Sequence, residues 1–206
     1  SMNTPALLRL MTLMSPSFPV GGFAYSSGLE QAVADGLVSD LQSLKDWLTA
    51  ALIAGAAWND AVLLNAAHAA NGDVGRLEYV AELAGALAGS RERYMESHNL
   101  GAAFGGAVKA GGLPCPNLPN PIAYPIAVGA VADANGIDAE PSAAAYLQAF
   151  INNQIQSAIR LGVVGQSGGV TLLVRLEFLI LETARRASLS TLEDLGVSSL
   201  MADIVS

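Results

Sequence analysis

The sequence of 206 residues contains few charged residues, a single cysteine and only two histidines. Charged residues make up 14% of the chain, well below the roughly 25% of typical soluble domains, whereas hydrophobic residues make up 52%. Few charges are therefore available to cover the apolar surface of a folded monomer. We expect part of that surface to face another subunit, so that the protein works in an oligomer or a complex.

Positive charge is scarce, because 10 Lys and Arg stand against 18 Asp and Glu and give a formal net charge of -8. Such a field repels phosphate backbones and anionic lipid headgroups, which argues against nucleic acid and against a membrane surface as partners. Cys115 cannot form an internal disulfide, and no secretory signal is recognisable after Ser1 and Met2, which have the look of an expression remnant. We expect a cytoplasmic protein.

Two long stretches lack charge, between Arg9 and Glu30 and between Lys109 and Asp133. Prolines and glycines interrupt both, and each proline removes a backbone donor that lipid cannot replace. Neither stretch is expected to span a membrane. The second one is apolar as well as proline-rich, so residues 111–125 are predicted to be a packed crossover within one domain.

Strand signals are missing, since apolar and polar residues do not alternate convincingly and no repeat period is evident. Apolar residues recur at helical spacing instead, after candidate caps at Thr4, Ser39 with Gln42, Asp73 and Ser90. We expect an all-α fold, a single domain over residues 3–206 built as a bundle of about eight to ten helices. The expected helices cover 4–14, 24–34, 41–52, 59–70, 73–87, 90–110, 126–135, 141–161 and 169–187, with a last short one after Ser190.

Residues for metal or covalent chemistry are few. Neither His68 nor His98 has a histidine, cysteine or carboxylate three or four positions away, the spacing that places two ligands on one helical face. Cys115 lies between Pro114 and Pro116 in an acidic chain, which favours a structural thiol. Nucleophile-elbow and nucleotide-loop motifs are also missing. We therefore expect no catalytic residue, no metal ligand and no cofactor bound tightly by this chain.

The first of two polar blocks, residues 19–30, is not obviously required for packing of the core. Two adjacent glycines allow close backbone approach, Tyr25 is the kind of rigid amphipathic side chain enriched at interfaces, and Glu30 adds a charge. The simpler alternative is a loop that merely leads into a helix. The candidate partner-binding residues of this block are Pro19, Gly21, Gly22, Tyr25, Ser26, Gly28 and Glu30.

A second polar block follows the long predicted helix 141–161. Arg160 stands at its end, and Gln166 lies in the glycine-rich hinge that leads to the next helix. Both are candidate partner-binding residues. In the simpler alternative, Arg160 complements the dipole of its own helix and Ser167 caps the following one.

The order of motifs along nearly the whole chain resembles the urease accessory protein UreF family. The matching segments are Leu7-Leu8-Arg9-Leu10, Pro19-Val20-Gly21-Gly22-Phe23, Gly28-Leu29-Glu30, Ser90-Arg91-Glu92, Tyr124-Pro125-Ile126-Ala127, Asn153-Gln154 and Gly165-Gln166. The Pro-Val-Gly-Gly segment is the most specific of them.

The resemblance implies an all-α, commonly homodimeric chaperone that helps to assemble the dinickel centre of urease and does not itself hydrolyse urea. It implies binding to the accessory protein UreD, also called UreH, and through that assembly to the GTPase UreG and apo-urease, with nickel held by the partners. On this basis we expect a GTPase-facing or gating surface at Tyr25 and Glu30 and a second contact at Arg160 and Gln166. Arg91 is a further candidate, because it belongs to the family's serine-arginine-glutamate segment.

Two departures from the family pattern limit what is carried over. The family usually has a lysine where this chain has Arg160, and the two side chains are not interchangeable at a tight contact. Family members also usually continue beyond the Leu200 region into a basic, aromatic tail, and a chain without that tail is expected to dock less tightly to UreD.

Two alternatives stay open at this point. One is a helical enzyme of unknown class with a pocket around Tyr25, Glu30 and Arg160, which requires those residues to converge. The other is a helical regulator that senses a small molecule, which requires a closed apolar cavity of ligand size and which the acidic charge disfavours.

Overall fold

The computed structural model describes residues 2–19 and 26–195, and all regular structure in these two ranges is helical. The all-α prediction is confirmed, and the number of described helices agrees with the expected eight to ten. The helices are α1 (Thr4–Leu13), α2 (Ser26–Ala34), α3 (Leu41–Ala54), α4 (Ala56–Ala69), α5 (Val74–Ala86), α6 (Arg91–Ala110), α7 (Tyr124–Ala134), α8 (Ala139–Arg160) and α9 (Gln166–Ser188).

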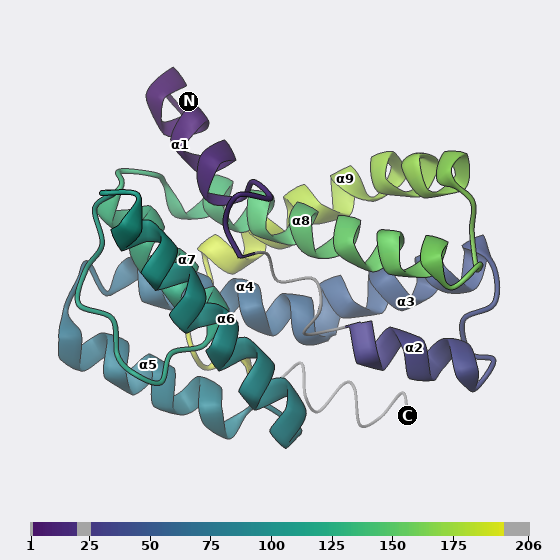
Figure 1. Cartoon of the computed structure of the whole chain (residues 1–206), viewed down its shortest axis with the longest axis horizontal. Helices are drawn as coiled ribbons and strands as arrows, with labels where there is room; N and C mark the ends of the chain where they lie inside the picture. The colour runs from purple at the N-terminus through teal and green to yellow at the C-terminus, as the bar shows by residue number, and fades with distance from the viewer. Residues whose placement is uncertain (1, 20–25, 196–206) are drawn as a thin grey trace.

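The centre of the bundle is α4, which runs through the middle of the molecule and contacts α3, α5, α7, α8 and α9 (Figure 1). Its buried residues lie on every side of the helix, as expected for a helix with no solvent face. Its main neighbour is α7, in which every residue from Tyr124 to Ala132 is buried. This pair is surrounded by the other helices and forms one continuous core with them.

Glycine permits the closest helix crossing in the core. At Gly129 of α7, an added Cβ would overlap the main-chain carbonyl oxygen of Leu64 in α4. A second glycine, Gly101 of α6, approaches the carbonyl of Ile122 in the same way. Any side chain at either position would push two backbones apart, so the packing of α4, α6 and α7 requires glycine there.

The two longest helices, α8 and α9, lie side by side and are joined by residues 161–165 (Figure 1). One side of α8 faces the core, and its residues are all buried. They are Leu147, Phe150, Ile151, Gln154, Ile155 and Ala158.

Three of the predicted caps are wrong by one or two residues. The cap of α1 is Asn3, whose Oδ1 accepts a hydrogen bond from the Ala6 amide at 2.9 Å. Asp40 caps α3 and forms a capping box with Ser43, in place of Ser39 and Gln42. Gly165 precedes α9 without any side-chain cap, so Ser167 has no capping role. The cap is the residue that keeps an extended backbone, and several neighbouring polar residues can chemically fill that role.

Other predicted boundaries are correct at two helices and shifted at several more. Asp73 and Ser90 cap α5 and α6 as predicted, with side chains that accept from the amides of Arg76 and Arg93. The helices α4, α7 and α9 begin two or three residues earlier than predicted. In α7, Pro125 falls in the first turn, where a helix needs no amide donor.

The proline-rich segment between α6 and α7 is packed, as predicted. Leu113 and Leu118 lie against the core, and Ile122 is buried. The prediction of a last short helix after Ser190 falls partly outside the described residues, which end at Leu195.

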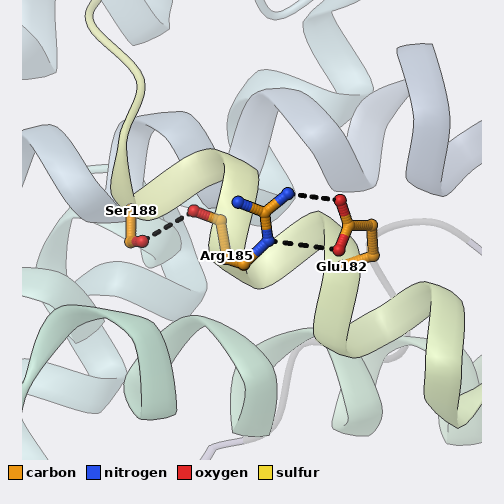
Figure 2. A network of polar contacts seen from close by, with 3 residues as sticks. All are labelled: Glu182, Arg185 and Ser188. Carbon is orange, nitrogen blue, oxygen red and sulfur yellow. Dashed lines mark hydrogen bonds and ion pairs between the residues drawn. The ribbon is translucent and has the colours of Figure 1, made fainter.

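A surface network secures the last turns of α9 (Figure 2). The Arg185 guanidinium donates two hydrogen bonds to the Glu182 carboxylate, at 3.2 and 2.6 Å, and the Ser188 hydroxyl donates to the carbonyl of Arg185 at 2.7 Å. All three residues lie one turn apart on the same side of the helix, so the network supports the end of α9 locally.

Residues 41–69 are the one stretch of the described chain that is long and apolar enough to cross a membrane by length and hydropathy alone. In the fold this stretch is α3 followed by α4, which meet at Gly55, and half of the tested window is buried inside the molecule. Core helices pass the same test, so the finding is weak evidence for a membrane span.

Candidate functional site

A row of aromatic rings leads from the N-terminal loop to a buried carboxylate. The Phe18 ring lies 6.0 Å from Phe104, which packs edge-on to Tyr124 at 5.7 Å, and Tyr124 lies 5.5 Å from Tyr146. At the end of the row, the Tyr146 hydroxyl donates a 2.6 Å hydrogen bond to Oδ2 of Asp60. The side chain of Asp60 is therefore a buried, hydrogen-bonded polar group in the middle of the central helix α4.

A small polar cavity of about 80 Å³ lies beside Asp60, between α4, α5, α6 and the start of α7. Its polar lining comes from Asn59, Asp60, Arg93, Ser97 and His98, among others. A space of this size holds a few water molecules and is too small for a drug-sized ligand. The cavity is far below ligand size, so it does not support the small-molecule regulator alternative.

The first polar block and the start of α6 meet at this side of the molecule. A Cβ added to Gly28 of α2 would have Nη2 of Arg93 as its nearest neighbour, at 3.9 Å. The next residue, Leu29, is fully buried, and Glu30 after it is exposed. Two segments that are about 60 residues apart in the sequence are therefore adjacent in space, with Leu29 as the anchor and Glu30 available at the surface.

The other candidate residues of the first block are placed as follows. Pro19 is half-buried beside Phe18, Ser26 begins α2, and Arg91 is exposed as the first residue of α6. The predictions for Gly21, Gly22 and Tyr25, and for the side chain of Ser26, lie outside the described residues.

The second block lies at the far ends of α8 and α9. Arg160 is exposed and donates from Nη2 to the Ser157 hydroxyl at 3.0 Å, and Gln166 is exposed as the first residue of α9. Among the described residues, no hydrogen bond or ion pair joins Glu30 to Arg160, and neither residue lines the cavity beside Asp60.

Both histidines contact main-chain carbonyls, and the cysteine thiol is not activated. Nε2 of His68 lies 2.7 Å from the carbonyl of Ile137, and Nδ1 of His98 lies 2.7 Å from the carbonyl of Tyr94. Burial raises the pKa of the Cys115 thiol, and Lys109 opposes this only in part, which is the opposite of what a reactive thiolate needs. Within residues 2–19 and 26–195, no group of three His, Cys, Asp or Glu is placed to hold a metal ion.

Sequence reasoning did not find Asp60, Tyr146 or Arg93. The signal that could have found Asp60 is its position, because an acidic residue interrupts an otherwise apolar helix that is half of residues 41–69. Its hydrogen-bond partner lies 86 positions further along the chain and has no such signal.

Comparison with known proteins decides the family. The UreF family model matches residues 38–177, which is more than half of the chain. The chain belongs to the UreF family. A relative from Rhizobium leguminosarum bv. viciae named urease accessory protein UreF is 53% identical over 203 residues, which cover 98% of this chain and 91% of the relative.

Other UreF proteins agree. A relative of the same name from Mesorhizobium japonicum is 53% identical over 201 residues, covering 97% of this chain and 90% of its own length. Urease accessory protein UreF 1 from Brucella abortus biovar 1 is 50% identical over 205 residues, covering 98% and 89%. The resemblance noted in the sequence is confirmed over nearly the full chain.

Membership of the UreF family also decides between the earlier alternatives. The relatives are named as accessory proteins of urease and not as enzymes. The enzyme alternative is therefore wrong. A non-catalytic accessory protein acts through its surfaces.

Proposed function

We propose that this protein is a non-catalytic subunit of the complex that assembles the dinickel centre of urease. It works in the cytoplasm as a homodimer, together with UreD (also called UreH), the GTPase UreG and apo-urease. It modulates GTP-dependent delivery of nickel, while the partners hold the metal tightly. Family membership supports the role of an accessory protein, and the exposed surfaces described below support a role in a complex.

The observation that carries the proposal is an apolar stripe on the outward side of α9. Val170, Val174, Phe178 and Leu181 recur at helical spacing, and Phe178 is 79% exposed. The opposite side of the same helix is buried against the core. We call these four residues the outer face of α9. A contiguous exposed apolar face on a soluble helix is typical of a surface that another subunit covers.

The N-terminal helix offers a second surface of this kind. Leu8 and Met11 of α1 are 65% and 61% exposed, and Leu7 lies next to them. On the other side of the helix, Ala6, Leu10 and Leu13 are buried. Two helices that are apolar on both sides agree with the low charge content of the chain and with a protein that works inside a complex.

Exposed polar residues supply the proposed specific contacts. Glu30 in the first polar block and Arg91 at the start of α6 are both exposed. We propose that UreG docks on this surface and also contacts Tyr25. Arg160 and Gln166 lie at the far end of α8 and α9 and supply a second contact. Nη2 of Arg160 donates a hydrogen bond to the Ser157 hydroxyl, and the other N–H groups of this guanidinium make no hydrogen bond to the described residues. These groups could bind a carboxylate of a partner.

The test is reconstitution from purified components. The wild-type chain, UreD, UreG and apo-urease are mixed with nickel and GTP, the assembly is followed by size exclusion with light scattering, and urease activation is measured. Phe178→Glu should remove the larger species and urease activation, because it places a charge in the outer face of α9.

Val74→Glu is the matched control. Val74 is also an exposed apolar residue, at the start of α5, and α5 and α9 lie on opposite sides of Figure 1. A glutamate is favourable in the first turn of a helix, so this variant should assemble normally. If Phe178→Glu, with an unchanged helical spectrum, assembles and activates urease as well as Val74→Glu does, the proposal is wrong.

Glu30→Ala tests the UreG contact separately. It should reduce recovery of UreG in the complex while UreD is retained. Equal recovery of UreG with the wild type and with Glu30→Ala would remove Glu30 from the proposed contact.

A further inference from the structure

A groove of about 500 Å³ lies between α5, the first half of α6 and the proline segment before α7. Glu78 and Glu82 of α5 form one wall, Tyr94 and His98 of α6 form another, and Asn120 and Pro121 close it from the third side. Tyr94 and His98 also line the small cavity beside Asp60, so these two rings separate the cavity from the groove. We call this the α5–α6 groove.

Neither carboxylate of the α5–α6 groove forms an ion pair with a described residue. Glu78 and Glu82 are one helical turn apart and exposed, and the ion pair found in the described part of the chain is the one between Glu182 and Arg185. No lysine or arginine lines the groove. Two like charges one turn apart repel each other, so a positively charged group between them would be stabilised.

His98 supplies a further acceptor. Its side chain is nine-tenths buried, and its Nδ1 lies 2.7 Å from the carbonyl oxygen of Tyr94. A carbonyl can only accept, so Nδ1 carries the hydrogen and donates it. In the neutral ring, Nε2 is then an acceptor, and it makes no hydrogen bond to the described residues. Nε2 is not fully enclosed by the protein, so it can accept a hydrogen bond from a group that enters the groove.

Tyr94 adds a flat aromatic wall. Its ring stacks on the His98 ring with centroids 3.9 Å apart and planes 22° apart. A Cβ added to Gly85 would lie 3.2 Å from the Tyr94 ring, so the absence of a side chain at Gly85 leaves room for the ring. The ring is thus held between α5 and α6 and lines the groove together with the two glutamates, and aromatic rings attract cationic groups.

We propose that the α5–α6 groove binds an arginine side chain from a protein partner. Apart from the Asn120 amide, the polar groups that line it are carboxylates, an imidazole acceptor and a tyrosine. The guanidinium group has five N–H donors and no acceptor, remains charged, and stacks on aromatic rings. Lysine has the charge but not the planar fork, and anions are repelled by the two glutamates. The inference goes beyond the proposed function, because it does not depend on which partner carries the arginine.

The experiment uses the full chain and three capped peptides, acetyl-GSGXGSG-amide, in which X is arginine, lysine or citrulline. Citrulline has nearly the shape of arginine but no charge. Affinities are measured by calorimetry, and the imidazole signals of His98 are followed by NMR on isotope-labelled protein. The arginine peptide should bind most tightly and shift the His98 signals, with citrulline about fivefold to tenfold weaker and lysine between them.

Paired variants assign the site. Glu78→Gln combined with Glu82→Gln should weaken binding of the arginine peptide about fivefold to tenfold. The matched control is Glu177→Gln combined with Glu193→Gln, which changes the net charge equally at exposed positions outside the groove and should leave the affinity unchanged.

Four results would overturn the proposal: no measurable binding of the arginine peptide, equal binding of the citrulline peptide, unchanged His98 signals, or equal weakening in the two double variants. The last of these would show attraction to net charge alone. None of these readouts requires UreD, UreG or urease, so the inference can fail while the proposed function holds, and the reverse is also true.

Discussion

The central helices α4 and α7 and the outer helix α9 are all rich in apolar residues, but they use them differently. In α4 and α7 apolar side chains are buried on every side, and Gly129 brings the two backbones into contact. In α9 one apolar side is buried at Leu172 and Leu176, while the other exposes Phe178. The same residue types therefore stabilise the folded chain in one region and remain free for association in the other.

This difference separates the effects of mutation. A change in the central pair should alter the free energy of unfolding, because it disturbs contacts made within the chain. A change on the outer face of α9 should alter association and leave folding nearly unaffected. Each prediction below tests one side of this contrast.

The largest effect is expected at the crossing of α4 and α7. Gly129→Val would force its side chain into the carbonyl of Leu64 and should lower the free energy of unfolding by about 3 kcal/mol or more. Urea denaturation followed by circular dichroism measures this change. The control is Gly106→Ala on α6, where nothing lies within 4 Å of an added Cβ and a slight gain of stability is expected. Similar behaviour of the two variants would mean that the crossing is looser than described.

The buried hydrogen bond comes next. Tyr146→Phe removes the hydroxyl that donates to Asp60 and should cost about 1 to 3 kcal/mol, because a buried carboxylate loses a donor. Tyr79→Phe, which removes a hydroxyl from a ring that is 53% exposed, should have almost no effect. Thermal and urea denaturation of both variants check the difference. An equal loss in the two proteins would show that Asp60 does not depend on Tyr146.

On the outer face of α9 a much smaller effect on folding is expected. Phe178→Ser should change the free energy of unfolding by no more than about 0.5 kcal/mol, measured at a protein concentration low enough to keep the chain monomeric. At higher concentration the same variant should have a smaller mass than the wild type by light scattering. A large loss of stability at low concentration would place Phe178 in the core of the monomer and would contradict the contrast drawn above.

The smallest effect concerns the surface network of α9 in Figure 2. Hydrogen bonding to Arg185 lowers the pKa of Glu182, so this contact stabilises the protein above the unfolded-state pKa and is lost as the pH falls through the folded-state pKa. When the pH is lowered from about 6 to 3, the thermal unfolding midpoint of the wild type should therefore fall slightly more than that of Glu182→Gln. Both groups are exposed, so added salt should reduce the difference. Parallel pH profiles would mean that the pair contributes nothing.

Much of the fold could be predicted because helix signals are local. Spacing placed all nine described helices, and Asp73 and Ser90 were correct as caps. The errors at Thr4 and Ser39 have a physical reason, since neighbouring polar residues can each form the cap and the choice depends on which one keeps an extended backbone.

The candidate site was less predictable. The exposure of Glu30, Arg91 and Arg160 agrees with their selection as surface contacts, but nothing in the sequence shows that Arg93 lies beside Gly28. Nothing in the sequence indicates that His98 lines the α5–α6 groove, because that groove exists only once α5, α6 and the proline segment have packed together.

Local patterns along the chain were enough to establish an all-helical protein with too few charges for its apolar content, because periodicity and composition can be counted without knowing any contact. Tertiary structure alone decided that Asp60 meets Tyr146, that Leu176 faces inward while Phe178 faces outward, and that Glu78 and Glu82 share a groove with His98. These relations depend on how whole helices pack, and packing joins residues whose distance along the chain carries no information about their distance in space.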